Sequence, residues 1–500
     1  MSYYNWRGFC LCGTEDLPPD AAAADAPFAP LVFLVRRDPL TSRGLYAIER
    51  PEELSEQPGP ASLLPCTAAA PELPEAAAAL VRAHGATVLN TAFRNAFSVL
   101  EAQLRRKKRG LRATLVGLGD VGGTVLTGLK LLGGELSEIA VFDPYAPMCA
   151  RYELELNQVL PVSDGQPMPR VTICPEERLF DCDVFLFTAS RGVPPLGSEV
   201  KDVRMAQYAA NREMLHQYAK KAREAGFRGL FCQISDPVDH LARAVFLYSN
   251  QDESGTYDFA GLLPEQIQGF GLGVMAARAA YMAEKTGLDF TNGRVYGPHG
   301  AGLIAANDYG AGYDAEASER LTQQTREANL RVRELGFKPY IAPGLSSAAI
   351  SVLRMLRGET YYSALPLGGC YFGCRCRRRS FRRRKLEGAG ALFRHRPAAQ
   401  RGRRCDDRLF LALSICAAGG RRRFRRLLRG NDLQDPAYPP DAAADVRQHP
   451  LTGPPSPNRI GRISAAKGPC RAAAGTRFSY FSSRILFSSR MKLLMSLNCR

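Results

Sequence analysis

Long apolar runs and a recognisable leader are both missing from this sequence. No apolar run in its 500 residues approaches the roughly 20 residues that a membrane-spanning helix needs. Residues 1–13 lack the basic stretch followed by an apolar stretch that marks a signal peptide. We therefore expect a cytoplasmic protein with no membrane partner.

The patterns that indicate disulfides or a metal are also absent. The 14 cysteines are scattered over 500 residues, unlike the dense frameworks of small secreted domains, so we expect free thiols. Cys370, Cys374 and Cys376 resemble half of a metal site. No His or Cys pair completes it at the spacing that zinc sites use, so we predict no metal.

An excess of positive charge is absent outside the last quarter of the chain. Residues 1–370 carry 36 Lys and Arg against 42 Asp and Glu, whereas residues 371–500 carry 30 against 7. The formal net charge of +17 therefore combines −6 in the first part with +23 in the second. This division argues against a nucleic-acid partner for the main part of the protein.

The basic segment, which we assign to residues 373–500, allows three interpretations. After about Cys376 its arginine runs interrupt the apolar fragments without an amphipathic period. It is a disordered tail that binds RNA or DNA, an Arg-rich arm that binds a protein, or a segment without selected structure. The third interpretation, a frameshifted or read-through translation of GC-rich coding sequence, is the one we favour.

A chain of 500 residues exceeds what one hydrophobic core usually serves, so we expect several domains. Residues 1–108 mix Pro- and Ala-rich stretches with two short apolar runs, which indicates a small α+β or partly disordered extension. We predict helices over residues 76–83 and 89–104 of this extension, the second from apolar spacings of 3 and 4.

From Leu111 onward, short apolar strands alternate with helices, which is typical of a parallel sheet with crossover helices. We predict an α/β protein with a doubly wound parallel sheet over residues 109–240 and an α+β substrate domain over residues 241–372. The strands that we predict for the sheet lie at residues 113–116, 139–142, 171–174, 184–187 and 230–234.

A glycine motif follows the first of these strands. It comprises Gly117, Leu118, Gly119, Asp120, Val121 and Gly122. Because it lies between a strand and a helix, its backbone N–H groups are placed to bind a pyrophosphate, as in Rossmann-type domains. Asp143, at the end of the next strand, would accept hydrogen bonds from both ribose hydroxyls and repel a 2′-phosphate. We therefore predict NAD as the cofactor, in preference to NADP.

Six further segments occur in order along the chain. They are residues 184–190, Arg204 with Asn211, residues 235–239, Arg278 after residues 269–271, residues 297–300 and residues 344–346. Together with the glycine motif they resemble the lactate/malate dehydrogenase family, over about residues 113–372. The resemblance implies an NAD-dependent enzyme that interconverts a small 2-hydroxy acid and a 2-keto acid, as a homodimer or homotetramer.

The resemblance also implies roles for individual residues. His299 would give a proton to the alkoxide that forms as hydride reaches a keto acid. Arg278 would bind the substrate carboxylate through two parallel N–H bonds, and Arg204 would close over the substrate and polarise its carbonyl. Thr188 and Ala189 match the family's cofactor-binding turn.

Two positions depart from the family pattern. Met275 stands where the family has the aspartate that pairs with its histidine, and Asp236 stands where the family has an asparagine. Without an acidic partner, an imidazolium is less favoured and the ring is less firmly oriented. Either Asp236 faces His299 and replaces the missing partner as a catalytic residue, or the site no longer performs this reaction.

Two rival functions follow from these observations. One is a catalytically silent, NAD-binding regulatory or scaffold relative. The other is a nucleic-acid-binding protein that works through the basic segment.

Overall fold

The computed structural model describes residues 1–14, 16–55, 59, 71–105, 109–191, 203–300, 302–378 and 395–397. All of the described residues lie in one compact unit, Met1–Ala443. No helix in the described ranges is long and apolar enough to cross a membrane.

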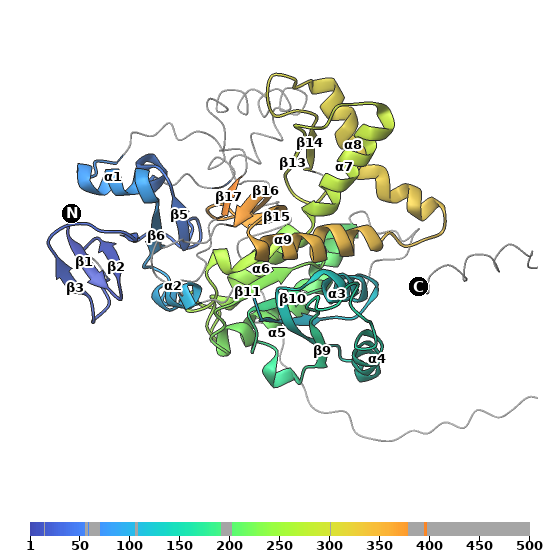
Figure 1. Cartoon of the computed structure of the whole chain (residues 1–500), viewed down its shortest axis with the longest axis horizontal. Helices are drawn as coiled ribbons and strands as arrows, with labels where there is room; N and C mark the ends of the chain where they lie inside the picture. The colour runs from blue at the N-terminus through green and yellow to red at the C-terminus, as the bar shows by residue number, and fades with distance from the viewer. Residues whose placement is uncertain are drawn as a thin grey trace, which may run out of the picture. The chain divides into compact units, whose positions relative to one another are not determined.

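The N-terminal region forms a sheet of its own (Figure 1). Its six strands lie in the order β3-β1-β2-β4-β6-β5, in which β2, β4 and β6 run parallel. The elements are β1 Tyr3–Trp6, β2 Phe9–Cys12, β3 Ala22–Ala24, β4 Leu31–Val35, β5 Leu45–Ile48, α1 Glu75–His84, β6 Ala86–Asn90 and α2 Ala96–Arg105. Ala77 and Val81 of α1 share a buried cluster with Phe33 and Val88 of the sheet.

The second helix of this region is shorter than the sequence predicts. The expected helix over residues 89–104 is wrong in its first part, because Leu89 belongs to β6 and Phe93 to a turn. Both side chains are buried, at 0% and 1% exposure. Two buried apolar residues, one in a strand and one in a turn, therefore have the same sequence spacing as the apolar face of a helix.

The main sheet confirms the predicted α/β fold. Its parallel strands lie in the order β9-β8-β7-β10-β11-β12, so the chain first runs outward from β7 and then returns past β7 to β10. This is the strand order of a doubly wound Rossmann-type sheet. The elements are β7 Leu111–Val116, α3 Asp120–Leu132, β8 Leu136–Phe142, α4 Ala146–Leu156, β9 Arg170–Ile173, β10 Val184–Phe187, α5 Val203–Glu224, β11 Leu230–Gln233, α6 Val238–Ser249 and β12 Ile267–Gly269.

Alternate residues of the central strands face opposite layers of helices. Phe185 and Phe187 of β10 share a buried cluster with Leu215 of α5, whereas Leu186 shares another with Val125 of α3. Because side chains alternate along a strand, a strand that is apolar throughout is buried on both faces.

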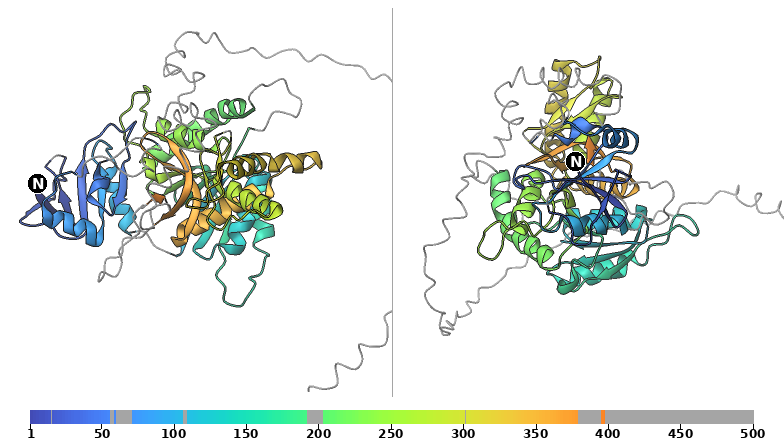
Figure 2. Two further views of the ribbon diagram at one scale, coloured as in Figure 1. Left: turned by 90° about the horizontal axis from the view of Figure 1, so that it is seen from above. Right: turned by 90° about the vertical axis from the view of Figure 1, so that its left-hand side faces the viewer.

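The remaining elements extend the sheet and cover one end of it. They are α7 Leu272–Thr286, β13 Arg294–Tyr296, β14 Ile304–Ala306, α8 Ala315–Glu334, the π-helical turn Pro343–Ala349, α9 Ile350–Arg357, β15 Thr360–Pro366, β16 Tyr371–Arg378 and β17 His395–Pro397. Strands β15 to β17 continue the sheet antiparallel beyond β12. Figure 2 shows the blue N-terminal strands beside the orange β15–β16 hairpin, where the Gly59 N–H donates to the Gly368 carbonyl.

The sheet crosses two boundaries that the sequence placed differently. It extends past residue 240 because β12 joins β11, and a strand of three residues shows no periodicity in the sequence. Residues 373–378, which we assigned to the tail, belong to β16. Cys374 and Cys376 are fully buried there and alternate with arginines. Because of these arginines, the sequence of the strand resembles that of the basic segment. The rest of the predicted tail, apart from residues 395–397, lies outside the described residues.

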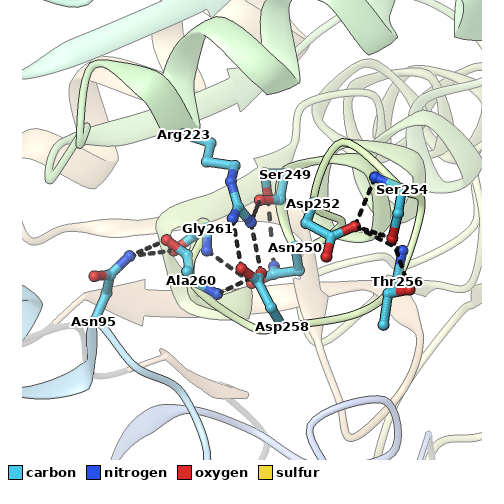
Figure 3. A network of polar contacts seen from close by, with 10 residues as sticks. All are labelled: Asn95, Arg223, Ser249, Asn250, Asp252, Ser254, Thr256, Asp258, Ala260 and Gly261. Atoms are coloured by element: carbon cyan, nitrogen blue, oxygen red, sulfur yellow. Dashed lines mark hydrogen bonds and ion pairs between the residues drawn. The ribbon is translucent and has the colours of Figure 1, made fainter.

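A polar network holds the loop of residues 250–262 (Figure 3). Arg223 of α5 donates two hydrogen bonds of 2.6 Å to the carboxylate of Asp258. Asn95, from the N-terminal region, donates to the carbonyl of Gly261 at 3.1 Å. This loop therefore links α5 to the segment that precedes α2.

A buried carboxylate makes a second link between the N-terminal region and the main sheet. Glu265, only 2% exposed, accepts hydrogen bonds from the backbone N–H groups of Gly44 and Leu45 at 3.0 to 3.2 Å. A buried charge is tolerated where hydrogen bonds of this kind compensate it.

Candidate active site

The glycine motif forms a tight turn between β7 and α3. Gly117 has a φ of +93°, and a Cβ there would lie 2.5 Å from the backbone of Ala189. A Cβ at Gly122 would lie 1.9 Å from the Gly117 carbonyl oxygen. At Gly119, the N-cap of α3, a Cβ would meet nothing within 4 Å. Two glycines thus serve the turn itself, while the third borders open space at the helix N-terminus.

The end of β10 braces this turn. The hydroxyl of Thr188 lies 2.6 Å from the carbonyl oxygen of Gly117 and 2.9 Å from that of Val116. Ala189 packs directly on Gly117, and Val121 packs against the buried cluster below the helix. These residues, predicted to bind cofactor, shape the turn in the structure.

Asp143 lies immediately after β8 and is bonded to the same turn. Its Oδ2 atom accepts from the backbone N–H of Leu118 at 2.8 Å, and its Oδ1 atom accepts from that of Tyr145 at 2.9 Å. The carboxylate is therefore fixed beside the glycine motif with lone pairs remaining on both oxygens.

Asp120, the first residue of α3, pairs with a lysine that follows α8. The Nζ atom of Lys338 lies 3.2 Å from its Oδ2 atom, and both side chains are largely exposed. A carboxylate at a helix N-terminus is favourable for the helix, but it would repel a bound phosphate. Lys338 offsets part of that negative charge.

His299 is held by two oxygens from different elements. Its backbone N–H donates to Asp239 of α6 at 2.9 Å, and its Nδ1 atom lies 2.8 Å from the carbonyl oxygen of Gly271. Because a carbonyl oxygen only accepts, Nδ1 carries a proton in this arrangement. Nε2 then points toward Asp236, whose Oδ1 atom lies 3.8 Å away.

Asp236 stands between β11 and α6, at a cis peptide bond with Pro237. The buried side chain of Asn211 donates to its carbonyl at 2.8 Å. Its Oδ1 atom is buried and has no hydrogen-bond partner among the described residues. The structure thus aims one unsatisfied carboxylate oxygen at the histidine.

Arg278 lies on α7, and its charge interacts with that of Asp236. Burial lowers the pKa of its guanidinium, and the charge of Asp236 raises it. Met275, one turn earlier, is 3% exposed, with its sulfur 3.8 Å from an Arg278 nitrogen. The structure therefore brings His299, Asp236 and Arg278 together.

Arg204 lies in the first turn of α5, and its side chain is outside the described part of the chain, as is the loop of residues 192–202.

Cys370, Cys374 and Cys376, in and beside β16, are all buried. Burial raises the pKa of Cys374 to about 12, which disfavours the thiolate that a metal requires. Within the described ranges, no group of three or more His, Cys, Asp or Glu side chains is placed to hold a metal ion.

The sequence of this chain is similar to known proteins over only part of its length. No protein-family model matches the chain. It is 29% identical over 188 residues to the L-lactate dehydrogenase of Streptococcus pneumoniae strain Hungary19A-6, which is 36% of this chain and 49% of that protein. Over this segment the chain resembles L-lactate dehydrogenases. This confirms the resemblance predicted from the motifs, although the chain spans about half the length of the curated relatives it matches.

Solved structures that align with the chain include dehydrogenases of both kinds. A lactate dehydrogenase from a Medee basin deep-sea metagenome is 16% identical with a TM-score of 0.45, covering 65% of this chain and 99% of that one. The malate dehydrogenase of Archaeoglobus fulgidus in complex with NADH is 17% identical with a TM-score of 0.45, covering 63% and 99%.

Several residues of this candidate site were not predicted from the sequence. Asn211 served only as a spacing marker, yet it fixes the backbone of Asp236. Asp239 belongs to a motif that we recognised, but its bond to the His299 backbone had no separate signal. The oxygen that holds the ring belongs to the Gly271 backbone, which no side-chain pattern reveals.

Proposed function

We propose that the protein is an NAD-dependent oxidoreductase that interconverts a small 2-hydroxy acid and a 2-keto acid. The observation that carries this proposal is the meeting of His299, Asp236 and Arg278 beyond the carboxyl ends of β11 and β12. The glycine motif follows the carboxyl end of β7 in the same parallel sheet. Ligands of such sheets bind at this edge, where the strand order reverses.

The residues around the glycine motif fit NAD. Open space at Gly119 admits a pyrophosphate to the N-terminus of α3. Asp143, fixed by Leu118, offers carboxylate oxygens to ribose hydroxyls and opposes a 2′-phosphate. A bound nicotinamide would supply or accept the hydride.

The chain's own residues would handle the substrate and the proton. Arg278 would bind the carboxylate of the substrate and so fix which face of its carbonyl is presented. His299, with Nδ1 bonded to Gly271, would give the proton of Nε2 to the substrate oxygen during reduction and take it back during oxidation. Arg204 would add positive charge at that oxygen, as the family resemblance implies.

One observation favours a second candidate, a silent NAD-binding relative. The carboxylate of Asp236 lies 3.8 Å from His299 and interacts electrostatically with Arg278, the residue proposed to bind the negative charge of a keto acid. Like charges disfavour binding, so the site would admit cofactor and reject the acid. A homodimer or homotetramer stays a prediction from the family resemblance, and a cytoplasmic location stays a prediction from the sequence.

Turnover of NADH over a panel of 2-keto acids tests the proposal. We expect oxidation of NADH with at least one acid, a large loss of kcat in His299→Gln, and a raised KM in Arg278→Gln. Fluorescence titration of NADH with each variant is the control, since neither residue belongs to the cofactor turn. Tight NADH binding without turnover of any acid would favour the silent relative.

A further inference from the structure

One carbonyl oxygen links His299 to a serine on the π-helical turn Pro343–Ala349. The Gly271 oxygen lies 2.8 Å from His299 Nδ1 and accepts the hydroxyl proton of Ser347 at 2.7 Å. The same hydroxyl oxygen accepts the backbone N–H of Val274 at 2.8 Å. Ser347 is 2% exposed, so bulk water competes little for these bonds. A continuous chain of hydrogen bonds therefore runs from α7 through Ser347 to the imidazole.

The turn that carries Ser347 is fixed against α7 and against the helix that follows the glycine motif. A Cβ at Gly273 of α7 would lie 2.3 Å from the carbonyl oxygen of Ser346. On the other side, a Cβ at Gly344 would lie 2.7 Å from Thr124 of α3. Such close approaches leave the turn little freedom, and π-helical turns occur frequently at functional sites.

We propose that Ser347 is a positioning residue for His299 and takes over the orienting task for which the family pattern uses an aspartate. This inference rests on the proposed function for its catalytic consequence. Met275, at the position of that aspartate, carries a thioether that orients an imidazole poorly. Ser347 instead anchors the Gly271 oxygen, and that oxygen keeps the proton on Nδ1.

The effect on the ring follows from the groups around it. If Nε2 alone carried the proton, the lone pair of Nδ1 would face the Gly271 oxygen at 2.8 Å, which is repulsive. Among the described residues, Asp236, from the turn before α6, and Asp239, from α6 itself, place carboxylates by His299, and Arg278 of α7 interacts electrostatically with Asp236. With Nδ1 protonated and bonded, Nε2 is the nitrogen that faces Asp236 and the proposed substrate position.

Replacing Ser347 by alanine tests this inference in the full-length protein. The change removes the hydroxyl, and with it the bonds to the Gly271 oxygen and the Val274 N–H. Long-range ¹⁵N–¹H NMR reports which imidazole nitrogen is protonated, and His299→Gln identifies the His299 signal among the 6 histidines. In Ser347→Ala we expect a population protonated on Nε2 alone to appear. We also expect kcat for a keto acid to fall about five- to tenfold with KM little changed, since Arg278 is untouched.

Ser351→Ala is the matched control. Ser351 is 4% exposed, and its hydroxyl donates to the Ser346 carbonyl at 2.7 Å rather than to Gly271. We expect this variant to keep the wild-type NMR signature and kcat. An unchanged protonation pattern in Ser347→Ala, or equal changes in both variants, would overturn the inference. If the wild-type protein turns over no keto acid, the proposed function fails, while the NMR comparison still decides the role of Ser347.

Discussion

The Nε2 atom of His299 lies 3.8 Å from the Oδ1 atom of Asp236, and that oxygen has no hydrogen-bond partner among the described residues. The separation is too long for a hydrogen bond but close enough for the charge of Asp236 to act on the ring. Because no hydrogen bond ties Nε2 to Asp236, Nε2 stays available to a substrate oxygen while Nδ1 remains at the Gly271 oxygen.

Asp236→Asn should therefore change how the site depends on pH. It removes the charge and keeps the shape, so we expect the pH midpoint of keto-acid reduction to fall and activity near neutrality to drop. The check is NADH oxidation measured across a pH series. His299→Ala, with a loss of about 10²- to 10⁴-fold, sets the floor. Unchanged or improved turnover in Asp236→Asn would mean that Asp236 only repels the substrate.

Asp143 should set the choice between NAD and NADP. Asparagine at this position keeps an acceptor for the Leu118 N–H, bonded at 2.8 Å in the structure, and removes the charge that opposes a 2′-phosphate. We expect the wild-type protein to bind NADH more tightly than NADPH. In Asp143→Asn we expect the ratio of the two affinities to fall about tenfold. Fluorescence titration with both cofactors measures it, and equal affinities in the wild-type protein would refute this role.

Alanine substitutions at two glycines of the turn between β7 and α3 should distinguish an effect on NADH binding from an effect on folding. An alanine methyl at Gly119 meets nothing within 4 Å, so Gly119→Ala should leave the melting temperature unchanged and weaken NADH binding. At Gly122 the same methyl would lie 1.9 Å from the Gly117 oxygen, so Gly122→Ala should lower the melting temperature. Normal NADH affinity in Gly119→Ala would place the pyrophosphate elsewhere.

The ion pair of Arg223 and Asp258 should make the free energy of unfolding depend on pH in the acidic range. Hydrogen bonding to Arg223 lowers the pKa of Asp258, so the pair stabilises the fold above the unfolded value of about 3.9. That contribution is lost as pH falls below this value. We expect Asp258→Asn to cost about 2 kcal/mol near pH 7 and much less near pH 3.

Chemical denaturation at both pH values measures this effect. Glu316→Gln breaks the exposed pair with Arg320 and is the control, with little change expected. A cost in Asp258→Asn that does not vary with pH would show that the pair is not the source of the effect.

Truncation after residue 378 and truncation after residue 372 should have different effects on stability and NADH binding. A protein ending at residue 378 retains β16 and should bind NADH as the full chain does. A protein ending at residue 372 loses the buried Cys374 and Cys376, so it should unfold or aggregate. Thermal melting and NADH titration of the two proteins give the comparison. Failure of the longer one to bind NADH would show that the basic segment contributes to the fold or the site.

The sequence predicts the parts of this protein that depend on local pattern. Gly117 and Asp143 lie where a strand, a turn and a helix follow one another within about thirty residues, and the structure joins them through the Leu118 N–H. Leu186 and its neighbours predict a strand buried on both faces because all of them are apolar.

Long-range and backbone features escaped prediction for physical reasons. Strand β12 has three residues, and in β16 outward arginines alternate with buried cysteines. The partner of His299 Nδ1 is a main-chain oxygen, which any residue supplies, and Ser347 reaches it from 76 residues away. Neither contact leaves a pattern in the sequence.

Transfer of deuterium from NADH labelled at the hydride position tests the central claim most directly. With the wild-type protein and a panel of 2-keto acids, we predict a 2-hydroxy acid that carries one deuterium at C2, detected by mass spectrometry, and almost none with His299→Gln. The absence of labelled product for every acid, in a protein that still binds NADH, would contradict the account.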